Sequence, residues 1–219
     1  GGTSDGAGDP SVHTAVGVMH GLRAVLEHQF GRNDFKGVSV AIQGLGAVGW
    51  KVAERLHAAG ARLTVADVRR QTAERAVAEF GAAIVLPENI HAEKVDIYSP
   101  CALGAVITEQ IVPAIRARAV AGAANNQLAS RRAGAALAAR GILYAPDFVI
   151  NAGGIISGLD AYFKMPGRNG SESMPLDTRL ARIHGRLTEI FKRAASEHRP
   201  PEAAAEQMAR ELIGRTPVH

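Results

Sequence analysis

Residues 38–67 read VSVAIQGLGAVGWKVAERLHAAGARLTVAD, and this stretch decides the fold of the chain. Its first apolar run ends at the glycine-rich segment 44–49, after which apolar side chains recur at helical spacing up to Gly60. A second apolar run, 62–66, then ends on Asp67. Strand, G-x-G-x-x-G turn, helix, strand and acid, in this order, form the fingerprint of a βαβ unit that binds an adenine dinucleotide.

Each glycine of the fingerprint has a separate physical role. Gly44 permits the tight turn that leaves the first strand, and Gly46 removes a side chain that would block the pyrophosphate. Gly49 lets the helix pack closely against the sheet. We expect the phosphates to bind the free N–H groups at the positive end of that helix.

Asp67 is the residue that selects the type of dinucleotide. Its carboxylate would accept hydrogen bonds from the hydroxyls of the adenosine ribose and would repel a 2′-phosphate, which favours NAD. Arg69 and Arg70 follow directly and could instead receive such a phosphate, although the start of a solvated helix is the simpler interpretation of these two arginines. Asp67 could also be a solvated carboxylate at the end of a strand.

Composition restricts the class of protein. The chain of 219 residues has a net charge of +4, is 47% hydrophobic and 5% aromatic, and mixes arginine with glutamate along its C-terminal segment. This mixture predicts solvated helix faces and argues against a nucleic-acid-binding groove. Cys101 is the only cysteine and the histidines show no metal-ligand spacing, so we expect neither a disulfide nor a metal site. No apolar run approaches the roughly 18 residues of a membrane span and no signal-peptide pattern is present, which favours a cytoplasmic protein that binds no membrane.

The remaining sequence alternates strand-like and helix-like segments, which predicts an α/β fold with a doubly wound parallel sheet of the Rossmann type. We expect residues 1–219 to form one dinucleotide-binding domain. Its core is predicted at about 36–154, with an N-terminal helix at about 10–29 and extra C-terminal helices at about 177–214. Asp9 and Pro10 form a good start for the first helix. Further predictions are strands at 82–86, 95–98, 119–124 and 142–144, and helices at 71–80, 108–116 and 128–140, of which the second is expected to end or kink at Pro113. A flexible lead-in is predicted at 1–8 and a loop at 157–175.

Polar or small residues follow several of the predicted strands. The segment 99–104 comes after one strand, Asn125 and Asn126 after the next, and Asn151 beyond the last. Because the carboxyl ends of parallel strands face one crevice, we expect these residues to converge there with the fingerprint and Asp67. The alternative for Asn125 and Asn151 is capping of backbone groups after a strand.

Taken together, these motifs resemble the Glu/Leu/Phe/Val dehydrogenase family, and in particular its leucine/phenylalanine/valine branch. The matching pieces occur in family order, and the C-terminal helices fit as well. The pieces are GDPS (8–11) with TAVGV (14–18), QGLGAVG (43–49), SPCALG (99–104), GAANNQL (122–128), GILYAPD (141–147) and NAGG (151–154).

The resemblance implies reversible oxidative deamination of an L-amino acid to a 2-oxo acid and ammonia, with NAD as hydride acceptor. It implies that Thr14 approaches the nicotinamide amide and that Asn125 reaches the substrate, with Asn151 close by. We interpret Cys101 as a packed small residue rather than a nucleophile, because no base partners it in the sequence. The cofactor-binding residues that the resemblance implies are Thr14, Gly44, Leu45, Gly46, Ala47, Val48, Gly49, Asp67, Val68, Cys101, Ala102, Leu103, Ala123, Ala124 and Asn125.

Enzymes of this family carry the lysine that polarises the carbonyl, and the aspartate for proton transfer, in an N-terminal domain that we expect to be absent from this chain. We therefore predict the NAD-binding domain of a branched-chain or aromatic amino-acid dehydrogenase, inactive without that domain, in an enzyme that as a whole is a homo-oligomer. One alternative is a dinucleotide-binding module or partner subunit without turnover. Another is a relative that has diverged to a different imine-forming or oxo-acid reaction.

Overall fold

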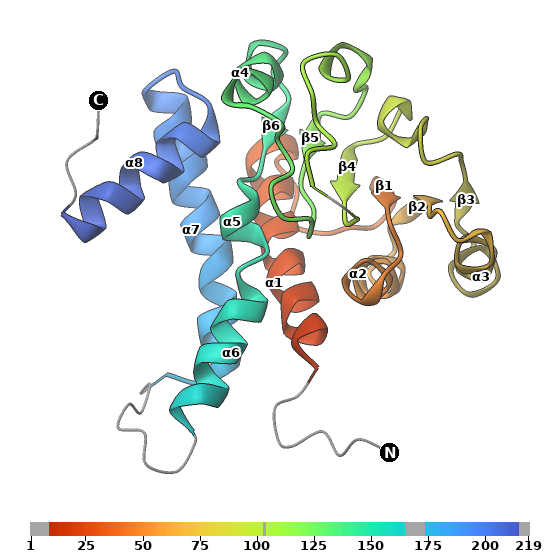
Figure 1. Cartoon of the computed structure of the whole chain (residues 1–219), viewed down its shortest axis with the longest axis horizontal. Helices are drawn as coiled ribbons and strands as arrows, with labels where there is room; N and C mark the ends of the chain where they lie inside the picture. The colour runs from red at the N-terminus through yellow and green to blue at the C-terminus, as the bar shows by residue number, and fades with distance from the viewer. Residues whose placement is uncertain (1–8, 103, 165–173, 215–219) are drawn as a thin grey trace.

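The computed structural model describes residues 9–102, 104–164 and 174–214. Six parallel strands form one sheet in the order β3-β2-β1-β4-β5-β6 (Figure 1), which confirms the doubly wound parallel sheet predicted from the sequence. The order reverses between β1 and β4, and in sheets of this type ligands bind at the carboxyl ends of the strands at that switch point. The strands are β1 (Ser39–Gln43), β2 (Arg62–Ala66), β3 (Ala83–Ile84), β4 (Ile97–Pro100), β5 (Ala119–Val120) and β6 (Leu143–Tyr144).

Helices connect the strands and continue beyond them, and α6, α7 and α8 lie together at one end of the sheet (Figure 1). The α-helix α1 passes without a break into a π-helical turn, η1 (Leu26–Phe30), and two 3-10 turns, η2 (Ile90–Ala92) and η3 (Val112–Ala114), lie between strands. The α-helices are α1 (Pro10–Val25), α2 (Ala47–Ala58), α3 (Arg70–Phe80), α4 (Arg131–Ala139), α5 (Asp147–Ile150), α6 (Gly153–Phe163), α7 (Leu176–Ser196) and α8 (Pro201–Ile213).

Both faces of the sheet are covered by helices. Successive side chains of a strand point to opposite faces, so each strand contributes to both buried sides. On β1, Val40 and Ile42 belong to the apolar core that includes side chains of α1, α2 and α7, whereas Ala41 belongs to a second core that includes α4. Ile97 and Tyr98 of β4 divide between the two cores in the same way. The two cores hold helices against opposite faces of the sheet, and loops follow the carboxyl ends of the strands.

The start of α1 agrees with the prediction. Asp9 is the N-cap and accepts a hydrogen bond from the Ser11 N–H at 3.0 Å, and Pro10 follows in the first turn. The Asp9 carboxylate also lies 3.0 Å from the Lys51 ammonium of α2. The Ser11 hydroxyl and the Lys51 ammonium lower the pKa of Asp9 to about 2. This contact joins the start of α1 to the helix of the fingerprint.

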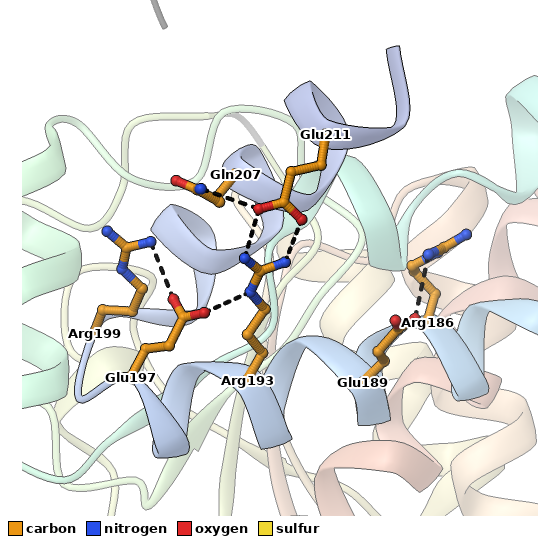
Figure 2. Close-up of polar contacts among 7 residues, drawn as sticks. All are labelled: Arg186, Glu189, Arg193, Glu197, Arg199, Gln207 and Glu211. Atoms are coloured by element: carbon orange, nitrogen blue, oxygen red, sulfur yellow. Dashed lines mark hydrogen bonds and ion pairs between the residues drawn. The ribbon is translucent and has the colours of Figure 1, made fainter. Parts of the chain in front are cut away.

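The two predicted C-terminal helices form as well. Ile183 and Leu187 of α7 are buried, and α7 packs along α1. Figure 2 shows the ion pairs that join α8 to α7. The Arg193 guanidinium donates to both carboxylate oxygens of Glu211 at 2.6 Å each, and its Nε donates to Glu197 at 2.7 Å. Planar, two-point pairing of this kind fixes the direction of α8 against α7.

The predicted helix at 108–116 is wrong. Only η3 is helical there, because Pro113 supplies no backbone N–H and the Thr108 hydroxyl accepts the Ile111 N–H at 3.2 Å. Side-chain bonding of this kind favours a turn over a regular helix. The other boundary changes are smaller: β3, β5 and β6 are shorter than predicted, and α4 begins at Arg131 because Ser130 is its N-cap.

The predicted loop at 157–175 is also wrong over its first part, which belongs to α6. Glycine weakens a helix locally, but here packing outweighs propensity. A Cβ at Gly153 would lie 2.2 Å from the His13 carbonyl oxygen, so the glycine lets α6 contact the backbone of α1. The rest of that loop, 165–173, and the predicted lead-in, 1–8, lie outside the described residues.

Candidate functional site

The glycine-rich loop leads from β1 directly into α2, as the fingerprint requires. Gly44 has a φ of +92°, and a Cβ there would lie 2.6 Å from the Ala102 Cβ. A Cβ at Gly49 would lie 2.1 Å from the Gly44 carbonyl oxygen. By contrast, a Cβ at Gly46 would meet no atom within 4 Å. Two of the glycines therefore permit close packing, and the third adjoins open space.

The first turn of α2 offers backbone donors beside that open space. Gly46 is the N-cap, and neither a side-chain cap nor an acidic residue occupies the first turn, which begins with Ala47 and Val48. The first N–H groups of a helix have no partner within the helix, and the macrodipole is positive there. An anion such as a pyrophosphate is the ligand that this end of a helix favours.

Asp67 follows β2 and bonds to the same loop. Its side chain is only 6% exposed, and its Oδ2 accepts the Leu45 N–H at 2.7 Å. The Oδ1 accepts the Arg69 N–H at 2.8 Å. Burial alone would raise the pKa of Asp67, but the hydrogen bonds from Leu45 and Arg69 lower it below its ordinary value. The carboxylate therefore stays ionised and ties the fingerprint loop to the end of β2.

The residues after Asp67 are exposed. Val68 is 89% exposed and offers an apolar surface next to the carboxylate. The Arg69 side chain lies 3.4 Å from Asp67, and the Arg70 side chain bonds to Glu74 at 2.7 Å. Both arginines thus have carboxylate partners, which agrees with the interpretation of this segment as the start of a solvated helix.

The chain that leaves β4 stays beside β1. The Cys101 N–H donates to the Gln43 carbonyl oxygen at 2.8 Å, and Ala102 packs against Gly44. Burial raises the pKa of the Cys101 thiol, in agreement with a packed residue rather than a nucleophile. Leu103, which was predicted to line the cofactor site, lies outside the described residues.

The segment after β5 runs along the end of β4. The Ala124 N–H donates to the Pro100 carbonyl oxygen at 3.0 Å, and a Cβ at Gly122 would lie 2.1 Å from that oxygen. Ala123 is half-buried, Ala124 is buried and Asn125 is exposed. The two predicted alanines therefore lie at the switch point, with the amide of Asn125 accessible beside them.

Gln127 holds this segment in place, and the sequence prediction missed it. Its side chain is fully buried, and its Nε2 donates to the Gly122 and Ala124 carbonyl oxygens at 2.9 Å each. Its backbone N–H donates to the Asp147 carboxylate at 2.8 Å. A glutamine within three residues of a run of small residues was the available signal, but only the folded chain shows which carbonyl groups it bonds.

Asn125 and Asn151 meet although they belong to different connections. The Asn151 Nδ2 donates to the Asn125 Oδ1 at 2.7 Å and lies 3.5 Å from the Ala123 carbonyl oxygen. Thr14 lies against Gly154, which follows Asn151 in the chain: a Cβ at Gly154 would be 2.7 Å from the Thr14 hydroxyl oxygen. The structure thus brings the predicted substrate residues together and leaves the Asn125 amide nitrogen as a donor.

This arrangement fits an adenine dinucleotide. Open space at Gly46, an uncapped helix start and an ionised carboxylate at the end of β2 lie side by side, as the motif requires. Within residues 9–102, 104–164 and 174–214, no group of three or more histidine, cysteine, aspartate or glutamate side chains could hold a metal ion. In the same described part of the chain, no helix is long and apolar enough to cross a membrane.

Known proteins are similar to this chain in sequence and in fold. The sequence profile of Glutamate/Leucine/Phenylalanine/Valine dehydrogenase matches residues 6–71 and 64–212. The leucine dehydrogenase of Thermoactinomyces intermedius is 40% identical over 207 residues, which are 94% of this chain and 55% of that protein. The phenylalanine dehydrogenase of Bacillus thermotolerans is 39% identical over 213 residues, 95% of this chain and 54% of that protein.

The fold comparison agrees with the sequence comparison. The crystal structure of L-tryptophan dehydrogenase from Nostoc punctiforme has a TM-score of 0.86 and 36% identity, and the match covers 95% of this chain and 62% of that one. The chain spans about half the length of the curated relatives that it matches.

Proposed function

This chain belongs to the glutamate/leucine/phenylalanine/valine dehydrogenase family, and from that premise we propose that it is the NAD-binding part of an L-amino-acid dehydrogenase. The whole enzyme would interconvert a branched-chain or aromatic amino acid with its 2-oxo acid and ammonia, as a cytoplasmic homo-oligomer. Bound NAD would supply the hydride acceptor. The observation that carries the proposal is the uncapped start of α2 beside the open space at Gly46 and the ionised Asp67.

The cofactor residues have separate tasks in this proposal. The N–H groups of Ala47 and Val48 bind the pyrophosphate, and Asp67 accepts hydrogen bonds from the adenosine ribose. The exposed Val68 provides an apolar contact for the adenine. Arg69 already bonds to Asp67, and the next arginine bonds to a glutamate, so neither is arranged to receive a 2′-phosphate. This arrangement favours NAD over NADP.

The substrate residues lie at the other side of the switch point. The residues that border the position expected for the nicotinamide are Thr14, Cys101, Ala102, Ala123 and Ala124. The family resemblance implies the same role for Leu103, which lies outside the described residues. The Asn125 amide nitrogen donates to an oxygen of the substrate, while Asn151 holds the Asn125 Oδ1 and so fixes the direction of the amide.

Turnover requires a cation at the carbonyl and an acid or base within hydrogen-bond reach. Two lysines of the described residues have other partners: Lys51 pairs with Asp9 at 3.0 Å and Lys164 with Asp160 at 2.7 Å. Because the family resemblance puts the catalytic lysine and aspartate in an N-terminal domain, we propose that the dinucleotide-binding domain, with its core at about 36–154, binds the cofactor but needs such a domain for the reaction.

Calorimetric titration of the chain with NADH and NADPH tests the binding proposal. We expect NADH to bind at least ten-fold more tightly than NADPH. Gly46→Val should abolish binding because its side chain fills the phosphate position, whereas Gly185→Val, in similarly open space on α7, should not. Equal binding by both variants would refute the assignment of the phosphate site. A preference for NADPH would refute the role of Asp67 in selecting NAD and would indicate that Arg69 receives the 2′-phosphate.

Assays with leucine, valine and phenylalanine test the reaction. The chain by itself should oxidise none of them, and turnover would refute the need for a separate catalytic domain. A module without a catalytic role would also bind NADH. The two differ in a second titration: an amino-acid dehydrogenase domain should bind a 2-oxo acid more tightly in the presence of NADH than in its absence, and Asn125→Ala should remove that gain.

A further inference from the structure

Apart from the dinucleotide site, a cavity lies between α5, α6 and α7, next to the segment that carries Asn151. Its volume is about 320 Å³, which is sufficient for a small organic ligand. Five apolar side chains, here called its floor, and three arginines, here called its rim, line the cavity, and none of the described residues that line it is acidic. The floor consists of Phe148, Val149, Ala152, Ile156 and Ile183, and the rim of Arg179, Arg182 and Arg186.

The three arginines share one side of α7 because they are spaced at helical intervals. Arg179 is nearly buried and pairs with Asp160 at 3.3 Å. Arg186 makes an exposed pair with Glu189 at 3.3 Å (Figure 2), which uses one nitrogen of its guanidinium. Arg182 has no hydrogen bond or ion pair with another residue of the described part of the chain. At Arg182 the rim therefore has a positive charge that no described neighbour neutralises.

The apolar side of the cavity is accessible as well. Phe148 is 50% exposed, and Ile155 of α6, 69% exposed, extends the apolar surface beyond the cavity. A single group of apolar side chains next to a cationic rim suits a ligand that is apolar at one end and anionic at the other. An inorganic anion would leave the floor uncovered, and a neutral apolar molecule would leave the guanidinium groups without a counter-charge.

We propose that this cavity binds a small carboxylate with an apolar body, at a site separate from the dinucleotide site. The carboxylate pairs with Arg182 and Arg186, and the apolar body covers Phe148 and Ile156. A guanidinium presents two parallel N–H donors to a carboxylate. The pairing therefore fixes the orientation of the carboxylate in addition to neutralising its charge. Ala152 is the covalent neighbour of Asn151, so an occupied cavity restrains the segment that presents this residue.

The proposal does not depend on the proposed function, because binding can be measured without cofactor or turnover. The probe is 3-phenylpropanoate, titrated into the 219-residue chain and followed by calorimetry and ligand-observed NMR. The neutral 3-phenylpropan-1-ol should bind at least ten-fold more weakly, and 3-phenylpropylamine more weakly still, because their bodies are alike and only the charged group differs.

Variants locate the probe on the surface. Arg182→Ala should weaken binding at least five-fold, and Phe148→Ala should weaken it as well. The matched control Arg132→Ala removes an exposed arginine of α4 that does not line the cavity, and it should leave the affinity unchanged. Asn125→Ala should also leave it unchanged, since this residue belongs to the dinucleotide site.

Several results would overturn the proposal. They are equal affinity for the carboxylate and the alcohol, equal loss in Arg182→Ala and Arg132→Ala, or no binding up to the solubility limit of the probe. Loss of binding in Asn125→Ala with binding kept in Arg182→Ala would place the probe in the dinucleotide site. Self-association that Arg182→Glu abolishes, without binding of the probe, would show a contact between two copies of the chain.

Discussion

Replacement of Gln127 by methionine tests how the segment at the end of β5 is held. The change keeps an unbranched side chain of similar volume but removes the amide that donates to the Gly122 and Ala124 carbonyl oxygens at 2.9 Å each. Gln127 is fully buried, so bulk water cannot simply take the place of the lost donors, and the change costs free energy. The structure thus isolates the contribution of two hydrogen bonds from that of packing.

The expected magnitude follows from these contacts. Each of two buried acceptors left without a donor costs about 1–3 kcal/mol. Against this, the Gln127 Oε1 has no hydrogen-bond partner among the described residues, so its removal returns about 1 kcal/mol. The net loss in the free energy of unfolding should be about 1–5 kcal/mol. NADH affinity should fall as well, because Ala123 and Ala124 belong to the segment that these bonds hold.

Urea unfolding measures the stability change, with an unchanged denaturant slope as the sign that only stability is altered. The matched control is Gln110→Met, an exposed glutamine, which should change stability by less than about 0.5 kcal/mol. A loss no larger than that of the control would show that the Gln127 amide is not what holds the segment. Loss of stability with unchanged NADH affinity would instead refute the role of the segment in cofactor binding.

Other predictions address single groups of the site and of its surroundings. Asp67→Ala should weaken NADH binding at least ten-fold and narrow the difference between NADH and NADPH; an unchanged calorimetric titration would refute the ribose contact. Gly49→Ala should lower the free energy of unfolding by about 2 kcal/mol, because its Cβ would lie 2.1 Å from the Gly44 carbonyl oxygen, and wild-type stability in urea would contradict this. Asp9 has a folded-state pKa of about 2, below its ordinary 3.8, so its contribution to stability is present above about pH 4 and is lost as the pH falls towards 2. Urea midpoints of Asp9→Asn should vary less over that range than those of the unmodified chain. Because desolvation raises the pKa of the Cys101 thiol, a disulfide reagent should label it more slowly in the folded chain than in urea, and equal rates would show that folding does not protect the thiol.

The sequence by itself predicted the parallel sheet, the place of the fingerprint and the C-terminal helices. These features depend on local signals: apolar runs bounded by glycine, a G-x-G-x-x-G turn and helical periodicity in α7 and α8. One wrong prediction, the helix at 108–116, concerns competing local signals, because Pro113 and the Thr108 hydroxyl favour a turn. The other concerns a segment in which local signals conflict with tertiary contacts. Glycines in α6 favour a loop locally, yet Gly153 is required for the contact between α6 and α1.

Only the tertiary structure decided how the site is assembled. It showed that Asp67 bonds to Leu45 of the fingerprint loop, that Asn151 bonds to Asn125, and that Gln127 holds the segment 122–124 that precedes Asn125. The partners in the first two bonds lie on different connections, 22 and 26 residues apart in sequence, so no periodicity or spacing records which donor meets which acceptor. Directional bonds of a few ångströms depend on how the strands are ordered and paired, whereas the strands themselves follow from the pattern of apolar residues along the chain.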